Sequence, residues 1–231
     1  MDRPLQRTVA FALVLPWLVL GCYVPWNGER FARSFHLDHA SASLSPELAT
    51  TLAVLSMPHV FYFLVWTNAS AFARLCRALH LGEPFKVFAW GAHLIKVAQL
   101  AALLRFFHFV PPSSVEDMSH RLLRFLLSLD PFQLLLGVEL IAMGQVLNAG
   151  VYSAIGEAGV YYGTRLGVKV PWVTGFPFTV APHPQYFGAT LSFWGALLLL
   201  NTADAAQRGL FVIALAMVVF YSFSSYVEQE L

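Results

Sequence analysis

Charged residues are scarce in this chain of 231 residues. Only 12% are Asp, Glu, Lys or Arg, whereas 58% are hydrophobic. Soluble domains carry about 25% charged residues. Because the deficit extends along the whole chain, we expect the protein to fold in lipid. The basic residues exceed the acidic ones by one, a balance that does not indicate a nucleic-acid partner.

Cysteine is nearly absent as well. Cys22 and Cys76 are the only two in the sequence, which is too few for a disulfide framework, and we interpret both as reduced structural thiols. The histidines and acidic residues form no set with metal-ligand spacing, so we predict no metal. The sequence also contains no internal repeat. These absences favour one integral membrane domain.

Long apolar segments are abundant. A helix needs about 20 residues to cross the bilayer core, and the last segment is long enough for two crossings. Polar residues and a glycine at 201–209 divide it and predict a tight turn. We therefore predict an all-α, integral membrane helical bundle of about five to six transmembrane helices, with the last two forming a hairpin. The segments cover residues 8–23, 48–66, 85–110, 132–155 and 186–226.

The beginning of the chain differs from the remainder. The apolar segment 8–23 follows a short basic head, as in a signal peptide, but no small-residue cleavage site follows it and Pro16 interrupts it. We favour a retained anchor helix over a cleaved signal. A polar connector comes next, and Ser45 before a proline predicts the start of a helix. We therefore expect an anchor and connector at 1–47 and a membrane domain at 48–231.

Polar side chains recur inside two of the apolar segments. His93, Lys96 and Gln99 lie three residues apart, and Glu139 lies in the following segment. A charge at mid-bilayer costs roughly 2.5–3.5 kcal/mol on insertion scales, so such residues face the bundle interior and usually have partners. A Lys96–Glu139 pair would form if the two helices were neighbours. Two interpretations stay open: polar contacts between helices, or binding of a substrate headgroup by His93, Lys96 and Gln99.

The longest polar region between apolar segments covers residues 156–188 and is rich in glycine, tyrosine and proline. Its glycines permit close approach of the backbone to a ligand or a helix. Pro184 is placed to open the next helix. Its aromatic residues are typical of an interfacial belt, and such rings also attract a sulfonium or ammonium. We interpret this region as the cofactor site of a membrane enzyme.

Three motifs in this region appear in order along the chain. They are Gly156-Glu-Ala-Gly-Val-Tyr-Tyr-Gly-Thr-Arg-Leu-Gly167, Phe176-Pro-Phe178 and Pro184-Gln-Tyr-Phe-Gly188. The set resembles the phospholipid N-methyltransferase family, most closely its plant-type phosphatidyl-N-methylethanolamine N-methyltransferases. The resemblance extends from about residue 52 to the end of the chain.

The resemblance implies S-adenosylmethionine as the cofactor. The family binds it through a Gly-x-Gly pair, matched here by Ala142, Met143 and Gly144, and through a Glu-Glu pair, matched by Glu228 and Gln229. One carboxylate therefore remains, and we expect Glu228 to be the catalytic residue. His183 stands where relatives carry other polar residues. The expected cofactor-binding residues are Ala142, Met143, Gly144, Gly156, Gly159, Tyr162, His183, Pro184, Tyr186, Gly188, Glu228 and Gln229.

The resemblance also implies methylation of phosphatidyl-N-methylethanolamine, and of its dimethyl form, toward phosphatidylcholine. Glu228 would neutralise the cationic reactants and accept a proton, directly or through water. The partner would be a phospholipid in the endoplasmic reticulum membrane, with the cofactor site facing the cytoplasm, and no obligate protein partner is evident. The alternatives are an isoprenylcysteine carboxyl methyltransferase, an NADPH-dependent membrane sterol reductase and a non-catalytic membrane protein.

Overall fold

The computed structural model describes residues 29, 33 and 35–230, and the regular structure in that part of the chain is entirely helical. The anchor helix expected at 8–23, and Cys22, lie outside the described residues. Cys76 is a free, buried thiol, as predicted. The elements are η1 (Leu37–His39), α2 (Pro46–Thr67), α3 (Ala69–Ala78), α4 (Pro84–Phe106), α5 (Val115–Ser128), α6 (Pro131–Val160), α7 (Pro184–Leu199), α8 (Ala203–Gln207) and α9 (Leu210–Glu230).

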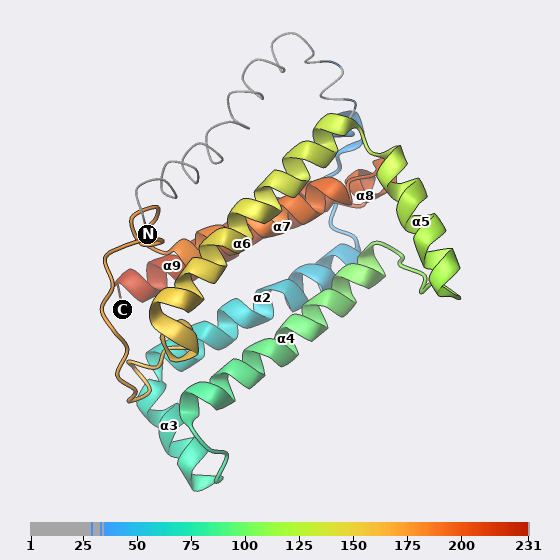
Figure 1. The fold of residues 1–231 in the computed structure, drawn as a ribbon. Coiled ribbons are helices and arrows are strands. Elements are labelled where there is room, and N and C mark those ends of the chain that lie inside the picture. The colour runs from blue at the N-terminus through green and yellow to red at the C-terminus, as the bar shows by residue number, and fades with distance from the viewer. Residues whose placement is uncertain (1–28, 30–32, 34, 231) are drawn as a thin grey trace.

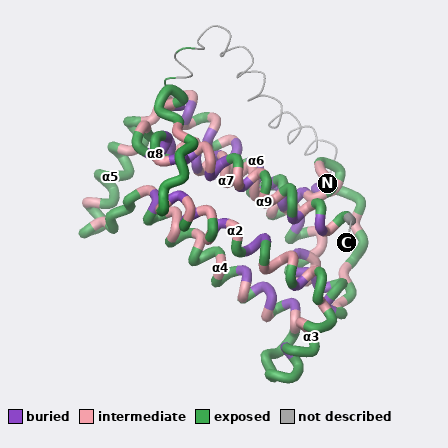
Figure 2. Tube along the Cα trace, turned by 180° about the vertical axis from the view of Figure 1, so that it is seen from behind, coloured by how far each residue is buried: buried purple, intermediate pink, exposed green. Residues whose placement is uncertain are grey.

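Five long helices pack in the order α6, α7, α9, α2, α4, each against the next (Figure 1). The short helix α3 and the segment 161–183 lie at one end of this bundle, which we call the site end. Helices α5 and α8 lie at the opposite end. Many buried residues lie along the helices, while much of the outer surface is exposed (Figure 2). Apolar side chains such as Trp90 and Leu94 of α4 point outward, as lipid-facing residues do.

Four described helices are long and apolar enough to cross a membrane: α2, α4, α6 and α9. Helix α7 has 16 residues, so its length of about 24 Å at 1.5 Å per residue falls short of the roughly 30 Å hydrocarbon core. The all-helical membrane fold is confirmed, whereas a count of five to six spans is not. Helices α7 and α9, joined by α8, form the predicted hairpin.

Local sequence signals set several helix starts. Ser45 caps α2, and its Oγ accepts a hydrogen bond from the backbone N–H of Leu48 at 3.1 Å. Proline at the first helical position has its φ preset and needs no hydrogen-bond partner for its nitrogen. Pro184 opens α7 in this way, as predicted. The other helices that begin with proline are α2, α4 and α6.

Glycines allow α6 and α7 to approach closely. A Cβ added to Gly188 would lie 2.7 Å from the carbonyl oxygen of Gly144, and a Cβ on Gly195 would meet the carbonyl of Gly137 in the same way. Seven residues separate the two glycines on each helix, so the contact repeats after two turns. Gln145 on α6 donates a hydrogen bond to the Ser192 hydroxyl at 2.9 Å, which adds a polar contact between the same helices.

We expect Gly188→Ala to destabilise the protein by about 1–3 kcal/mol, because the added methyl group collides with backbone rather than with a movable side chain. The matched control is Gly175→Ala, where nothing lies within 4 Å of the new Cβ. Thermal unfolding of both variants in the same lipid would measure the difference. Equal melting temperatures for the two would contradict the proposed close contact.

Candidate active site

A carboxylate and two phenols meet at the site end. Tyr186 lies in the first turn of α7, Glu228 lies near the end of α9, and Tyr162 follows α6. The Tyr162 hydroxyl donates to Glu228 Oε1 at 2.6 Å, and the Tyr186 hydroxyl donates to the same oxygen. The two phenol oxygens are 3.2 Å apart. Residues from three elements are thus connected through one carboxylate oxygen.

The backbone after α6 places Tyr162. Helix geometry breaks at Gly156, which has φ 65°, and Tyr162 itself has φ 57°, in the left-handed region that costs a non-glycine residue about 1–2 kcal/mol. Aromatic packing holds the residue there, since its ring stacks on Phe88 at 4.8 Å and meets Trp66 edge-on at 4.9 Å. Burial, together with the negative charge of Glu228, raises the pKa of the Tyr162 hydroxyl well above its ordinary value. Tyr162 therefore stays protonated and remains a donor.

His183 approaches the same carboxylate from its other side. The residue is at the N-cap position of α7, and its Nδ1 lies 3.6 Å from Glu228 Oε2. Its ring stacks on Tyr186, with centroids 6.0 Å apart. The two oxygens of Glu228 therefore have different neighbours: Oε1 accepts from phenols, and Oε2 faces an imidazole.

Two cavities have three lining residues in common, Pro182, His183 and Tyr186. The first has a volume of about 350 Å³ and the second a volume of about 470 Å³. Because His183 and Tyr186 line both, they form a shared wall. The first cavity is also lined by Trp66, Gly159, Tyr162, Thr164, Arg165, Phe178, Pro184 and Glu228. The second is also lined by Phe187, Thr190, Tyr221, Ser222, Ser225, Tyr226 and Gln229.

Trp66 and Arg165 are among the residues of the first cavity that sequence reasoning missed as site residues. The Arg165 guanidinium lies over the Trp66 ring, 3.7 Å from its centroid, and donates to the Trp66 carbonyl oxygen at 3.3 Å. The Trp66 indole nitrogen is buried, and no hydrogen-bond partner for it exists within the described residues. A buried N–H without a partner is costly, whereas the Arg165 guanidinium keeps further N–H groups for a ligand in the cavity. A tryptophan at a helix end is typical of an interfacial belt, and its sequence position carried no further signal.

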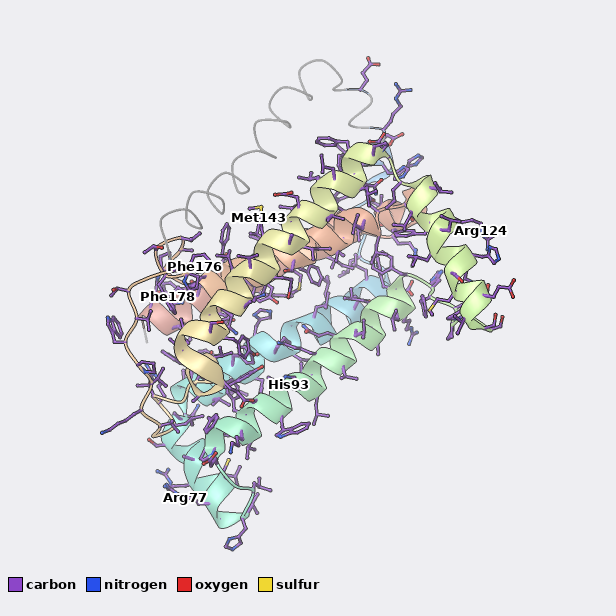
Figure 3. The ribbon with its side chains drawn as sticks, viewed as in Figure 1. Arg77, His93, Arg124, Met143, Phe176 and Phe178 are labelled. Atoms are coloured by element: carbon purple, nitrogen blue, oxygen red, sulfur yellow. The ribbon has the colours of Figure 1, made fainter. Side chains whose placement is uncertain are left out.

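The expected cofactor-binding residues divide into groups. Six of them, Gly159, Tyr162, His183, Pro184, Tyr186 and Glu228, line the first cavity, and Gln229 lines the second. Gly144 and Gly188 lie at the α6–α7 contact, and Gly156 marks the break in α6. Ala142 and Met143 belong to α6, and Figure 3 shows Met143 well along that helix from Phe176 and Phe178, which lie in the segment at the site end.

The polar residues of α4 do not form one cluster. Gln99 donates a hydrogen bond to the Leu55 carbonyl of α2 at 2.9 Å, and so joins two helices. His93 Nδ1 contacts the Ala89 carbonyl of its own helix at 2.6 Å, and Figure 3 shows this residue on α4. Lys96 is exposed. The suggested Lys96–Glu139 pair is wrong: no ion pair joins these residues in the described structure, in which α4 and α6 occupy opposite edges of the packed helices.

Comparison with known proteins gives one family. Residues 132–231 match the phospholipid methyltransferase family. The chain is 38% identical over 150 residues to a phosphatidyl-N-methylethanolamine N-methyltransferase of Arabidopsis thaliana, an alignment that covers 65% of this chain and 77% of that protein. It is 32% identical over 86 residues to a phosphatidylethanolamine N-methyltransferase of Homo sapiens, covering 37% of this chain and 41% of that protein. No solved structure matches.

Proposed function

The chain belongs to the phospholipid methyltransferase family, and we propose that it methylates the headgroup nitrogen of phosphatidyl-N-methylethanolamine and of its dimethyl form, toward phosphatidylcholine. The observation that carries this proposal is the Glu228 carboxylate, held by Tyr162 and Tyr186 in the wall of a cavity at one end of a membrane bundle. The relatives named above are N-methyltransferases, which disfavours the carboxyl methyltransferase and the sterol reductase.

We propose S-adenosylmethionine as the methyl donor and the first cavity as its site. When bound, it supplies a methyl group on a positively charged sulfur. The cavity wall fits this molecule, because Glu228 offers a negative charge to its cationic groups and the tyrosine rings offer cation–π faces. Arg165 offers N–H donors to a carboxylate. Gly144 and Gly188 support the site indirectly, by letting α6 and α7 approach closely.

The enzyme's own task is positioning and proton removal. The headgroup nitrogen is an ammonium at neutral pH and reacts only as the neutral amine. Holding two reactants in line supplies several kcal/mol, and a nearby base contributes further. The acyl chains of the lipid can stay in the membrane while its headgroup enters between helices. We retain Lys96 as a candidate contact for the lipid phosphate, since it is an exposed cation on α4.

One assay tests the proposed function. The purified protein in lipid nanodiscs would receive labelled S-adenosylmethionine with phosphatidylethanolamine, its monomethyl form or its dimethyl form, followed by lipid analysis. We expect label in the lipid with the last two substrates. Transfer only to a prenylated cysteine offered in a parallel reaction, or to none of these acceptors, would overturn the proposal.

We also propose that the membrane is the endoplasmic reticulum and that the site end faces the cytoplasm. Asn68, in the sequon Asn68-Ala-Ser70, lies between α2 and α3 at this end and is exposed. We therefore expect it to carry no glycan in eukaryotic cells. The control is Pro112→Asn, which completes a sequon with Ser114 between α4 and α5, at the opposite end. Endoglycosidase treatment should shift the gel mobility of this variant alone, and a shift in the wild-type protein would reverse the orientation.

A further inference from the structure

The geometry points to His183 as the group that takes the proton from the headgroup nitrogen, with Glu228 holding the resulting imidazolium, and this inference rests on the proposed function. The lipid amine would then approach from the second cavity and contact the methyl donor directly beside His183, which lines both cavities.

Glu228 is poorly arranged to accept the proton itself. Its Oε1 already accepts two phenol hydrogen bonds, from Tyr162 and Tyr186. A proton placed on Oε1 would displace at least one of them. Its Oε2 faces His183 Nδ1 at 3.6 Å. The carboxylate is therefore surrounded by groups that stabilise its negative charge, which suits an electrostatic role.

His183 has the free atom that Glu228 lacks. With the Nδ1–H directed at Glu228, the neutral imidazole presents the Nε2 lone pair as an acceptor. No hydrogen bond or ion pair engages Nε2 within the described residues, and the His183 side chain is 21% exposed and lines both cavities. After protonation, the carboxylate at Oε2 stabilises the imidazolium. In hydrolase triads a histidine likewise takes the proton and a carboxylate stabilises the imidazolium that forms.

The other residues that face His183 leave few alternatives. Of the described residues that line the two cavities, His183 and Glu228 are the ones with an imidazole or a carboxylate side chain. The remaining titratable or charged lining groups are phenols and a guanidinium, and a neutral phenol or a guanidinium is a much weaker proton acceptor than an imidazole. They are Tyr162, Tyr186, Tyr221, Tyr226 and Arg165.

The step balances without another reagent. The ammonium N–H bond breaks, and its proton moves to His183 Nε2 while the electron pair stays on nitrogen. That pair forms the new N–C bond as the C–S bond breaks and its electrons return to sulfur. The positive charge passes from sulfur to the methylated nitrogen, and the imidazolium releases its proton to water before the next turnover.

The test compares two acceptors in His183→Gln. With the monomethyl lipid at neutral pH, we expect kcat to fall about 100-fold. With a lipid whose headgroup ends in an aminooxy group, which is uncharged at neutral pH and needs no deprotonation, we expect wild-type turnover. The affinity for S-adenosylmethionine would be measured by calorimetry, and kcat at saturating donor, because His183 also lines the donor cavity and its effect on binding must be separated from its effect on turnover. His120→Gln on the exposed face of α5 is the matched control and should behave as wild type with both acceptors.

The outcomes separate the two levels of inference. Equal loss of turnover with both acceptors would overturn the role of His183, and so would a loss explained by weaker donor binding. In either case, methylation of the lipid by the wild-type protein would still support the proposed function. Failure of the wild-type protein to methylate either lipid would overturn the proposed function itself.

Discussion

Glu228→Gln is expected to lower kcat about 100- to 1000-fold, the range found when one preorganised electrostatic group is removed from an active site. Glutamine has the same shape and keeps an oxygen that can accept from Tyr162 and Tyr186. It loses the negative charge that faces His183 and the cationic reactants. Membrane insertion and thermal stability should therefore change little, and the loss should appear in turnover.

Single-turnover methylation of the monomethyl lipid would measure this effect without interference from product release. The control is Glu157→Gln, which removes an exposed carboxylate from the last turns of α6 and should leave turnover unchanged. If His183 and Glu228 act as one unit, the double variant should lose scarcely more than the more damaging single variant. Full activity of Glu228→Gln would exclude the carboxylate from the chemistry.

The positions of the helices could be predicted because their signals are local. Ser45 and Pro46 mark the start of α2, and Pro184 marks the start of α7. The lengths of the apolar segments predict α2, α4, α6 and α9, and the polar turn after α7 predicts the hairpin. Helix α5 was not predicted. Its apolar and polar residues are mixed in sequence and separate into two faces only once the segment is helical.

The order of the helices could not be predicted, because contacts between distant segments determine it. Gly137 and Gly144 of α6 can be recognised as contact residues only once Gly195 and Gly188 of α7 are known to lie opposite them. For the same reason, a pairing of Lys96 with an acidic residue on α6 could be suggested but not tested. Polar residues in a hydrophobic segment indicate a partner without identifying it.

The site was anticipated in its members but not in its contacts. Family resemblance singled out Tyr162, Tyr186 and Glu228, whereas their sharing of a single carboxylate oxygen depends on a fold that joins residues up to 66 positions apart. Trp66 could not be distinguished from an interfacial tryptophan until its indole N–H was found buried without a partner. Its pairing with Arg165, 99 residues away, is likewise a property of the fold.

Arg165→Met is expected to weaken binding of S-adenosylmethionine about 10- to 100-fold, since hydrogen bonds to charged groups contribute about 1.5–3 kcal/mol. The guanidinium lies flat on Trp66 and gives one hydrogen bond to its carbonyl, which leaves other N–H groups for an anion in the first cavity. Arg165→Lys should recover part of the affinity, because lysine keeps the charge but not the planar stacking. Lys169→Met, on the same segment but in neither cavity wall, is the control.

A donor fragment identifies the group that Arg165 binds. Methylthioadenosine has the adenosine and sulfur of the donor but lacks its carboxylate, so Arg165→Met should bind this fragment as the wild-type protein does. Loss of affinity for the donor alone, measured by calorimetry, therefore assigns the guanidinium to the carboxylate. If Arg165 instead held the lipid phosphate, donor affinity would stay constant and the KM for the lipid would rise. The two cavities would then exchange roles, with the headgroup on the Arg165 side of His183 and the donor on the Gln229 side.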